Sequence, residues 1–264
     1  MLVRTMLGSL SVIALLGAGT AGAEEVKAAG DSKPAEATAP VRETRAIEAL
    51  QRMSRNLRSL KSFEVTSHSD IDRLDDAGQL IKFSNDVTYK VALPNRLYAS
   101  IVNGRANREM YYDGQQFTLY GKKLNYYATV KAPATVGELV ATLDEKYGIQ
   151  LPLTDLFLWG TDHAPVNDIQ AARYVGASVL GKQVCDQYAY RQGEVDWQLW
   201  ISRGDKPLPC KLAIVDSSDA ARPQAVMSYE WRADARIAAS TFKFTAPKNA
   251  HPIVLNAASA ADKQ

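Results

Sequence analysis

The sequence predicts an α+β protein, mainly antiparallel β, built as an open, incomplete β-barrel of about eleven strands with helices covering its concave face. Segments that alternate apolar and polar residues fill both halves of the chain, and turn signals such as Asp75–Gly78 and Asp113-Gly114 separate them. The few segments with helical periodicity are too short to shield the apolar face of so long a sheet. We therefore expect a hollow lined by apolar side chains.

Residues 1–23 have the layout of a secretory signal peptide, with Arg4, an apolar core from Met6 to Leu16, and the small-residue site Ala21-Gly22-Ala23. This core is too short to span a bilayer, and no cysteine stands at the cleavage point for a lipid anchor. We expect a periplasmic protein, soluble after cleavage. The remaining chain predicts a disordered linker (24–41), one half-barrel domain (42–248) and a flexible tail (249–264).

A helix is expected from Glu43 to Leu60, because apolar residues recur every three or four positions and arginines lie on the polar side. The hydrophobic period then changes to two. Strands are expected near residues 63–66, 87–93, 97–101, 110–112, 117–119 and 124–130. The tight turns between them predict an antiparallel meander with one apolar face.

The middle of the chain predicts a well-defined helix. Thr135 and Glu138 form a capping box, and Gly148 is a typical residue to end the helix. Residues 151–159 follow as the most apolar stretch after the leader, and Pro152 is suited to open a short further helix. This stretch has two interpretations: it fills the core, or it forms part of a lid over a cavity.

The second half predicts another meander, with strands near 172–180, 182–191, 196–202, 211–216, 225–232 and 239–244. Alternation places Trp197, Leu199 and Ile201 on one face of their strand and Trp200 on the other.

The chain has two cysteines, and an oxidising compartment favours a disulfide between Cys185 and Cys210. In a simple meander these cysteines flank the middle strand, and strands two apart are separated by about 9.6 Å, which is too far for a disulfide. The bridge therefore requires the segment before Cys210 to fold over the end of that strand, or Cys210 to lie outside the ladder.

Enzymatic and metal-binding motifs are not evident. His68, His163 and His251 are far apart and show no metal-ligand spacing, and Asp70–Asp76 lacks the spacing of a calcium loop and is better explained as a solvated turn. The net charge of +2 and the absence of a basic block argue against nucleic-acid binding. We therefore predict no catalytic residue, no metal and no cofactor.

Three segments carry a resemblance to a known family. They are Met110–Gly114 with Phe117–Tyr120, Leu153–Phe157, and Asp196–Ile201 running to Pro207–Lys211. Together they resemble the predicted periplasmic proteins grouped as DUF2092, a family similar to the lipoprotein-carrier superfamily of LolA, LolB and RseB. The resemblance covers about Glu43 to Pro247. It implies a LolA-like half-barrel with helices in its mouth, and in the carriers the cavity holds acyl chains.

We therefore predict a non-enzymatic, monomeric protein that binds an acyl chain of a lipid or lipoprotein, with transient contacts to envelope proteins or a membrane surface. Residues of the apolar faces are the candidates that line the cavity: Val87, Tyr89, Val91, Leu97, Ile101, Tyr112, Phe117, Leu119, Leu139, Leu143, Leu156, Phe157, Trp159, Trp197, Leu199 and Ile201.

Two alternatives remain open. An RseB-type interaction or sensing module without lipid cargo predicts an exposed apolar patch on the convex face, where Trp200 would lie. A hydrolase predicts that His68 or His163 converges with an acid and a nucleophile in one cleft.

Overall fold

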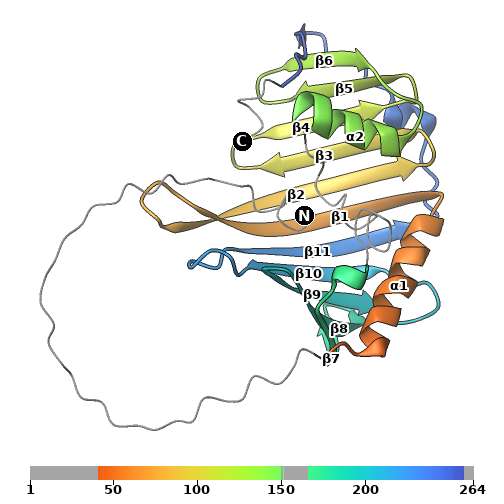
Figure 1. Ribbon diagram of the computed structural model, residues 1–264. Helices are drawn as coiled ribbons and strands as arrows, with labels where there is room; N and C mark the ends of the chain where they lie inside the picture. Colours follow the sequence, from red (N-terminus) through yellow and green to blue (C-terminus); the bar gives the residue numbers. More distant parts are fainter. Residues whose placement is uncertain (1–40, 150, 152–165, 259–264) are drawn as a thin grey trace, which may run out of the picture.

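The computed structural model describes residues 41–149, 151 and 166–258 (Figure 1). The signal peptide and linker predicted for residues 1–41 lie outside this range except for Val41, and so does the helix expected from Pro152. The boundaries of the domain remain a prediction.

The first meander contains six strands: β1 (Ser62–Leu74), β2 (Leu80–Ala92), β3 (Arg96–Asn103), β4 (Asn107–Tyr112), β5 (Gln116–Gly121) and β6 (Tyr126–Lys131). The second contains β7 (Ala171–Leu180), β8 (Gln183–Gln192), β9 (Val195–Ser202), β10 (Pro209–Asp216) and β11 (Gln224–Ala233). A short β12 (His251–Pro252) follows. Strands β1 and β2 are longer than expected because their polar outer halves also pair with each other, down to Leu74 and Leu80.

All of these strands belong to one twelve-stranded sheet with the order β12-β6-β5-β4-β3-β2-β1-β11-β10-β9-β8-β7. The two meanders join where β11 pairs antiparallel with β1, so the first strand of the chain lies in the middle of the sheet. Since β12 and β7 are the edges and do not pair, the sheet is open. The predicted mainly antiparallel, incomplete barrel is confirmed.

Helix α1 (Thr44–Ser59) lies over the β7–β11 side of the sheet (Figure 1). Its buried stripe contains Leu50, Met53 and Leu57. The chain entering the helix is fixed to β7, because the backbone N–H of Glu43 donates to the carbonyl of Ala172 at 2.8 Å. The carbonyl of Ala46 also accepts from the Tyr190 hydroxyl at 2.9 Å.

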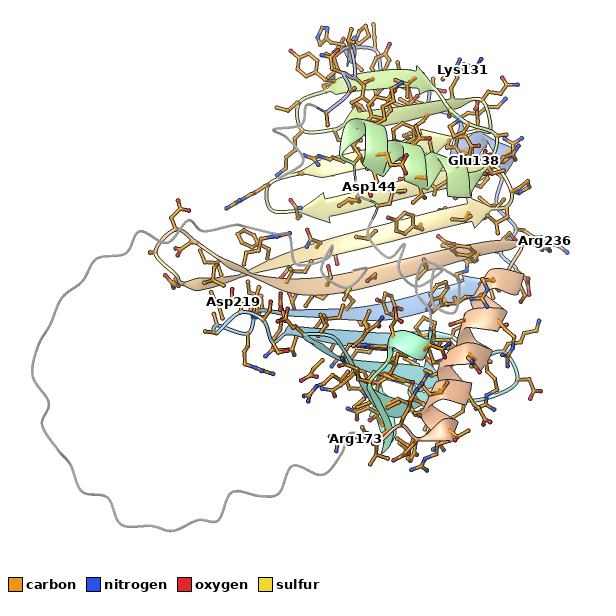
Figure 2. All side chains as sticks on the ribbon, viewed as in Figure 1. Lys131, Glu138, Asp144, Arg173, Asp219 and Arg236 are labelled. Atoms are coloured by element: carbon orange, nitrogen blue, oxygen red, sulfur yellow. A yellow bond between two sulfur atoms is a disulfide. The ribbon has the colours of Figure 1, made fainter. Side chains whose placement is uncertain are left out.

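Helix α2 (Val136–Tyr147) lies over the β3–β5 side of the sheet (Figure 1). The predicted capping box is present: Glu138 N–H donates to Thr135 Oγ1, and the Glu138 carboxylate accepts from Thr135 N–H. Gly148 ends the helix with a φ of 63°, a left-handed conformation that glycine adopts without a steric penalty. Figure 2 labels Glu138 near the start of α2 and Asp144 near its end, and both side chains are exposed.

The strand predicted at 239–244 is wrong, because Ala239–Phe242 forms a 3-10 helix, η3, that lies against β3 and β4. Phe242 and Phe244, whose spacing of two suggested a strand, pack against other parts of the protein instead. Phe242 is almost fully buried, and the Phe244 ring lies 5.0–5.4 Å from the rings of Tyr111, Tyr120 and Tyr127. These tyrosines point to the convex face. The apolar spacing at residues 242–244 therefore comes from packing of this segment against the convex face of the sheet.

The start of the segment expected to be a flexible tail is also hydrogen-bonded. Strand β12 pairs parallel with β6, and Ile253 N–H donates to the carbonyl of Tyr127 at 2.8 Å. Further on, Ala258 N–H donates to the carbonyl of Lys146 at the end of α2. The physical reason is that β6 would otherwise expose unpaired backbone groups along the edge of the sheet.

The disulfide between Cys185 and Cys210 is confirmed, and its Cα atoms lie 6.7 Å apart. A β-bulge makes the bridge possible across the middle strand. Pro209 pairs with Ile201 and Lys211 with Trp200, so Cys210 is the extra residue of β10. A bulged strand bends locally, which brings Cys210 over the end of β9 toward Cys185.

Trp200 covers this disulfide on the convex face. Its side chain is only 8% exposed and packs with both cysteines, and its Nε1 donates to Ser178 Oγ at 3.2 Å. Lys211 Nζ lies 4.9 Å from the centre of the ring. The expectation of an exposed apolar patch at Trp200 is therefore wrong, because the tryptophan shields the sulfur atoms.

Replacement of both cysteines by alanine is expected to lower the free energy of unfolding by about 3 kcal/mol, because the bridge closes a loop between positions 25 apart. Urea unfolding of wild-type and C185A/C210A proteins measures this change. Reduced wild-type protein is the control for the loss of sulfur volume. Equal midpoints for oxidised and reduced wild type would contradict the prediction.

Candidate functional site

The concave face of the sheet is the candidate site. The antiparallel register places its residues in rows that run across β11, β1, β2, β3 and β4. The two rows nearest the β2–β3 turn are apolar: Phe63, Val91, Leu97 and Tyr112 form one, and Trp231, Val65, Tyr89, Ala99 and Met110 form the other. Nearly all of these side chains are buried in a single apolar cluster, so this part of the face is continuous.

The described residues predicted to line a cavity lie together on this face and on the helix above it. The strands contribute Val87, Tyr89, Val91, Leu97, Ile101, Tyr112, Phe117, Leu119, Trp197, Leu199 and Ile201, and α2 contributes Leu139 and Leu143. All are buried except Ile101 and Leu119, which are half-buried against the same cluster. Leu156, Phe157 and Trp159 lie outside the described residues. That these residues line a cavity remains a prediction.

Buried phenols keep this face uncharged. The Tyr190 ring stacks on Trp197 with centroids 4.1 Å apart, and burial raises the pKa of the Tyr190 hydroxyl. Burial likewise raises the pKa of the Tyr89 hydroxyl on β2. Both hydroxyls therefore stay protonated at physiological pH, and the surface they contribute suits an apolar ligand.

Sequence reasoning missed a polar strip that crosses this apolar face. It consists of Ser67 and Ser69 of β1, Asn85 of β2 and Asn103 of β3. Ser69 pairs with Asn85 across the strands, and Asn85 pairs with Asn103, whose Nδ2 donates to Asn85 Oδ1 at 2.9 Å. Ser67 and Ser69 have the same parity as Phe63 and Val65, which was the signal available in the sequence.

Ser67 differs from its neighbours in the strip. Its side chain is 1% exposed, and its Oγ has no hydrogen-bond partner within the described structure. It lies between Val87 of β2 and Tyr229 of β11 in the register. A buried hydroxyl without a partner destabilises a fold, so this position calls for an explanation.

Arginines lie where the strip reaches β4. Arg108 pairs with Ile101, so it is on the concave face next to Asn103, and its side chain is exposed. The guanidinium of Arg105, in the turn after Asn103, lies 4.7 Å from the centre of the half-buried Phe83 ring. The open end of the face is thus cationic, although its centre is not.

A separate surface pocket of about 600 Å³ lies beside the β4–β5 turn and the chain leading into α2. It is lined by Gly114, Gln115, Gln116, Thr129, Val130, Lys131, Ala132 and Ala134. None of the predicted lining residues belongs to it, so this pocket is not the expected acyl cavity.

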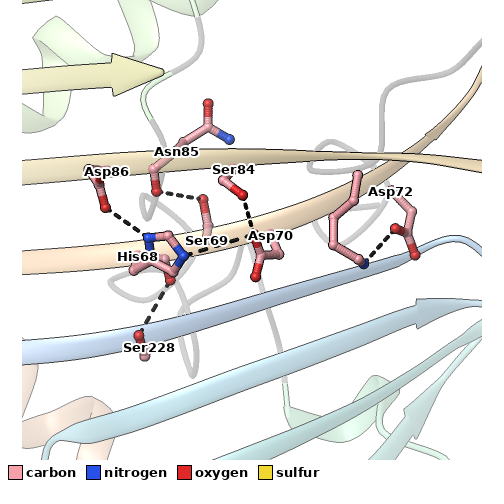
Figure 3. A network of polar contacts seen from close by, with 9 residues as sticks. His68, Ser69, Asp70, Asp72, Ser84, Asn85, Asp86 and Ser228 are labelled. Atoms are coloured by element: carbon pink, nitrogen blue, oxygen red, sulfur yellow. Dashed lines mark hydrogen bonds and ion pairs between the residues drawn. The ribbon is translucent and has the colours of Figure 1, made fainter. Parts of the chain in front are cut away.

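Figure 3 shows a polar network at β1 and β2, in which His68, Asp70 and Asp86 lie on the convex face, while Ser69 and Asn85 belong to the polar strip of the concave face. His68 Nδ1 lies 2.8 Å from Asp86 Oδ1, and His68 Nε2 lies 3.9 Å from Asp70 Oδ1. The neighbouring hydroxyls are engaged elsewhere, since Ser84 Oγ donates to Asp70 and Ser228 Oγ donates to the backbone carbonyl of His68. Within the described residues, no hydroxyl contacts the His68 ring, so the arrangement expected of a hydrolase is not assembled here.

The turn beyond this network is held by its own aspartate. Asp75 Oδ1 accepts hydrogen bonds from the backbone N–H groups of Ala77 and Gln79, at 3.0 and 2.8 Å. This is the ordinary function of aspartate in a hairpin turn.

The hydrogen bond to Asp86 raises the pKa of His68 above its ordinary value of about 6.5. The protonated ring therefore stabilises the fold, fully at pH below 6.5, and this contribution is lost as the pH rises through the pKa of the folded state. Asp86→Asn should lower the pKa of His68, measured by NMR titration. Asp70→Asn is the matched control and should lower it less, since Asp70 is farther away. An unchanged titration in D86N would refute the assignment.

In the part of the chain that the structure describes, no helix has the length and apolar character needed to cross a bilayer. No curated protein sequence matches the chain.

Solved structures of similar topology include LprF from Mycobacterium bovis, at 13% identity, covering 80% of this chain and 99% of that one with a TM-score of 0.47. The lipoprotein LppX of Mycobacterium tuberculosis has 8% identity over 75% of this chain and 99% of its own, with a TM-score of 0.39. A LolA superfamily protein from Nitrosomonas europaea has 10% identity, coverage of 75% and 97%, and a TM-score of 0.30. Similarity this low says nothing of what the present chain binds.

A family model described as "Predicted periplasmic protein (DUF2092)" matches residues 46–256, which include α2, every strand of the sheet and all of α1 except its first two residues. This confirms the resemblance inferred from the tyrosine and tryptophan segments and agrees with the expected periplasmic location. The chain therefore belongs to the DUF2092 family of predicted periplasmic proteins.

Proposed function

We propose that this protein binds an acyl chain of a lipid or lipidated protein on the concave face of its sheet, as a non-enzymatic carrier or binding protein of the periplasm. The observation that carries the proposal is the continuous apolar face formed by β11, β1, β2, β3 and β4. Its two apolar rows run across these strands and follow one another along them, so a hydrocarbon chain laid along the strands would stay in contact with apolar side chains of both rows.

The arrangement of the helices supports this function. Helices α1 and α2 lie on opposite sides of the concave face, and among the described residues no α-helix lies across β1 and β2 between them (Figure 1). Helix α1 is attached to β7 through Glu43 and, near its other end, by Asn56 Nδ2, which donates to the carbonyl of Pro207. Helix α2 is attached at its start, where Val136 N–H donates to the carbonyl of Pro94, and at its end, where Ala258 N–H donates to the carbonyl of Lys146. A ligand between them would gain about 0.8 kcal/mol for each methylene removed from water.

Contact with another envelope protein is the second candidate. It is favoured by apolar side chains near the free edge of the sheet, where Val175, Val179 and Val184 are 48, 73 and 43% exposed. An edge strand with exposed apolar side chains is a surface that a partner strand can extend. This surface borders Trp200, whose Nε1 donates to Ser178 Oγ of the same edge strand, and it differs from the patch first expected because the exposed side chains are the valines and not the tryptophan.

The acyl-binding proposal is tested with delipidated protein and a fluorescent fatty acid. Wild type should bind it in the micromolar range or tighter. Val87→Trp should weaken binding at least about tenfold, because the indole would occupy the space meant for the chain, and it should change the free energy of unfolding by less than about 1 kcal/mol. Thr88→Trp is the matched control, since Thr88 lies on the opposite face of the same strand.

A filled interior gives the opposite pattern. Wild type would then not bind the fatty acid, and the extra volume of Val87→Trp would be forced into a packed core at a cost of about 1–3 kcal/mol. Mass spectrometry of protein purified from its own envelope would then also find no retained lipid. Those results together would exclude acyl binding at this face.

A further inference from the structure

The concave face changes in polarity along its strands. On β1, the apolar Phe63 and Val65 are followed on this face by Ser67 and Ser69, then by the half-buried Ile71 and the exposed, charged Arg73. The polar strip, Ser67, Ser69, Asn85 and Asn103, therefore lies between the apolar rows near the β2–β3 turn and the end where the β1–β2 and β3–β4 hairpins project (Figure 1). Amphiphilic lipids have their groups in this order: hydrocarbon, then ester or amide linkage, then head group.

The polar strip can make hydrogen bonds that the fold itself does not use. Ser67 Oγ is buried with no partner among the described residues, so its hydroxyl proton is free to donate to a carbonyl oxygen. Asn85 Oδ1 accepts from Asn103 Nδ2, and the Asn85 amide nitrogen donates to no described residue, so its two hydrogens can serve a ligand. A ligand carbonyl beside the polar strip would accept a hydrogen bond from the Ser67 hydroxyl, which otherwise lacks a partner and destabilises the protein without ligand.

Cationic side chains end the strip on its β4 side. Arg105 and Arg108 make no ion pair with any described residue. Arg105 is held over the Phe83 ring, and Arg108 lies on the concave face beside Asn103. Two guanidinium groups without carboxylate partners next to neutral donors suit a phosphate ester, which accepts bidentate hydrogen bonds from arginine.

We propose that the ligand is an anionic glycerophospholipid, bound with its acyl chains over the apolar rows, its ester carbonyls at Ser67 and Asn85, and its phosphate at Arg105 and Arg108. This assignment rests on the proposed acyl-binding function and specifies its ligand and orientation. A triacylated lipopeptide shares the chains and carbonyls but has no phosphate, so the arginines distinguish the two ligands.

The head-group assignment is tested by competition for the delipidated protein with dioleoyl phosphatidylglycerol, dioleoyl phosphatidylcholine, a triacylated lipopeptide and hexadecane. Phosphatidylglycerol should bind about tenfold tighter than phosphatidylcholine or the lipopeptide at low salt, and raising the salt should reduce this preference. The double variant R105Q/R108Q should lose the preference and keep its affinity for hexadecane. The control variant K131Q/K248Q removes the same amount of positive charge from exposed positions elsewhere (Lys131 is labelled in Figure 2). It should keep the preference for phosphatidylglycerol.

The carbonyl contact is tested with Ser67→Ala. This variant should bind both phospholipids several-fold more weakly and hexadecane unchanged. Its free energy of unfolding should not fall, because the substitution removes a buried hydroxyl that has no partner. A variant that is destabilised and loses affinity for every ligand equally would show that Ser67 serves the fold, and would overturn its assignment to the ligand.

The remaining outcomes separate this proposal from the function on which it rests. Equal binding of both phospholipids, or tighter binding of the lipopeptide, overturns the anionic head group and leaves acyl binding standing. Failure of every ligand, hexadecane included, overturns both proposals. Displacement of phosphatidylglycerol by inorganic phosphate at equal concentration would identify a phosphate site instead of a lipid site.

Discussion

The pairing of β1 with β11 is the constraint on which the rest of the structure depends. It joins strands from opposite ends of the domain, and the ion pair between Arg232 and Glu64, 168 positions apart, lies along it. Without this pairing each meander would be a separate sheet with its own exposed apolar face. Closing so long a loop is entropically costly, and the nine residue pairs of the register, together with the apolar rows behind them, repay it.

Local features of the fold were accessible from the sequence. The capping box of α2, the apolar stripe of α1 and the alternation at Trp197, Leu199 and Ile201 all follow from interactions within a few residues. The bulge at Cys210, the insertion of Phe242 and Phe244 into the back of the sheet, and strand β12 depend on surfaces formed by distant segments. A spacing of two between apolar residues, as at Phe242 and Phe244, does not distinguish a paired strand from an unpaired segment that packs two aromatic rings against a sheet.

The candidate site divides in the same way. Its apolar members were predictable because alternation alone assigns Val87, Tyr89 and Val91 to one face. The polar strip was not, because Ser69, Asn85 and Asn103 come from three strands and become neighbours only through the register. Polar residues also interrupt the apolar pattern by which strands are recognised. For this reason the sequence predicted the first strand only near residues 63–66, and the polar strip lies beyond that range.

The strip also explains why one sheet can serve as both core and binding surface. Rows near the β2–β3 turn are apolar and buried, and they resemble the interior of any stable domain. Ser67 lowers stability where an aliphatic residue would raise it, and such a cost is typical of positions that serve a ligand. The apolar rows near the β2–β3 turn thus belong to the core and would also carry the acyl chains, whereas the polar strip and the arginines beside it hold donors that the fold does not use and that a ligand could satisfy.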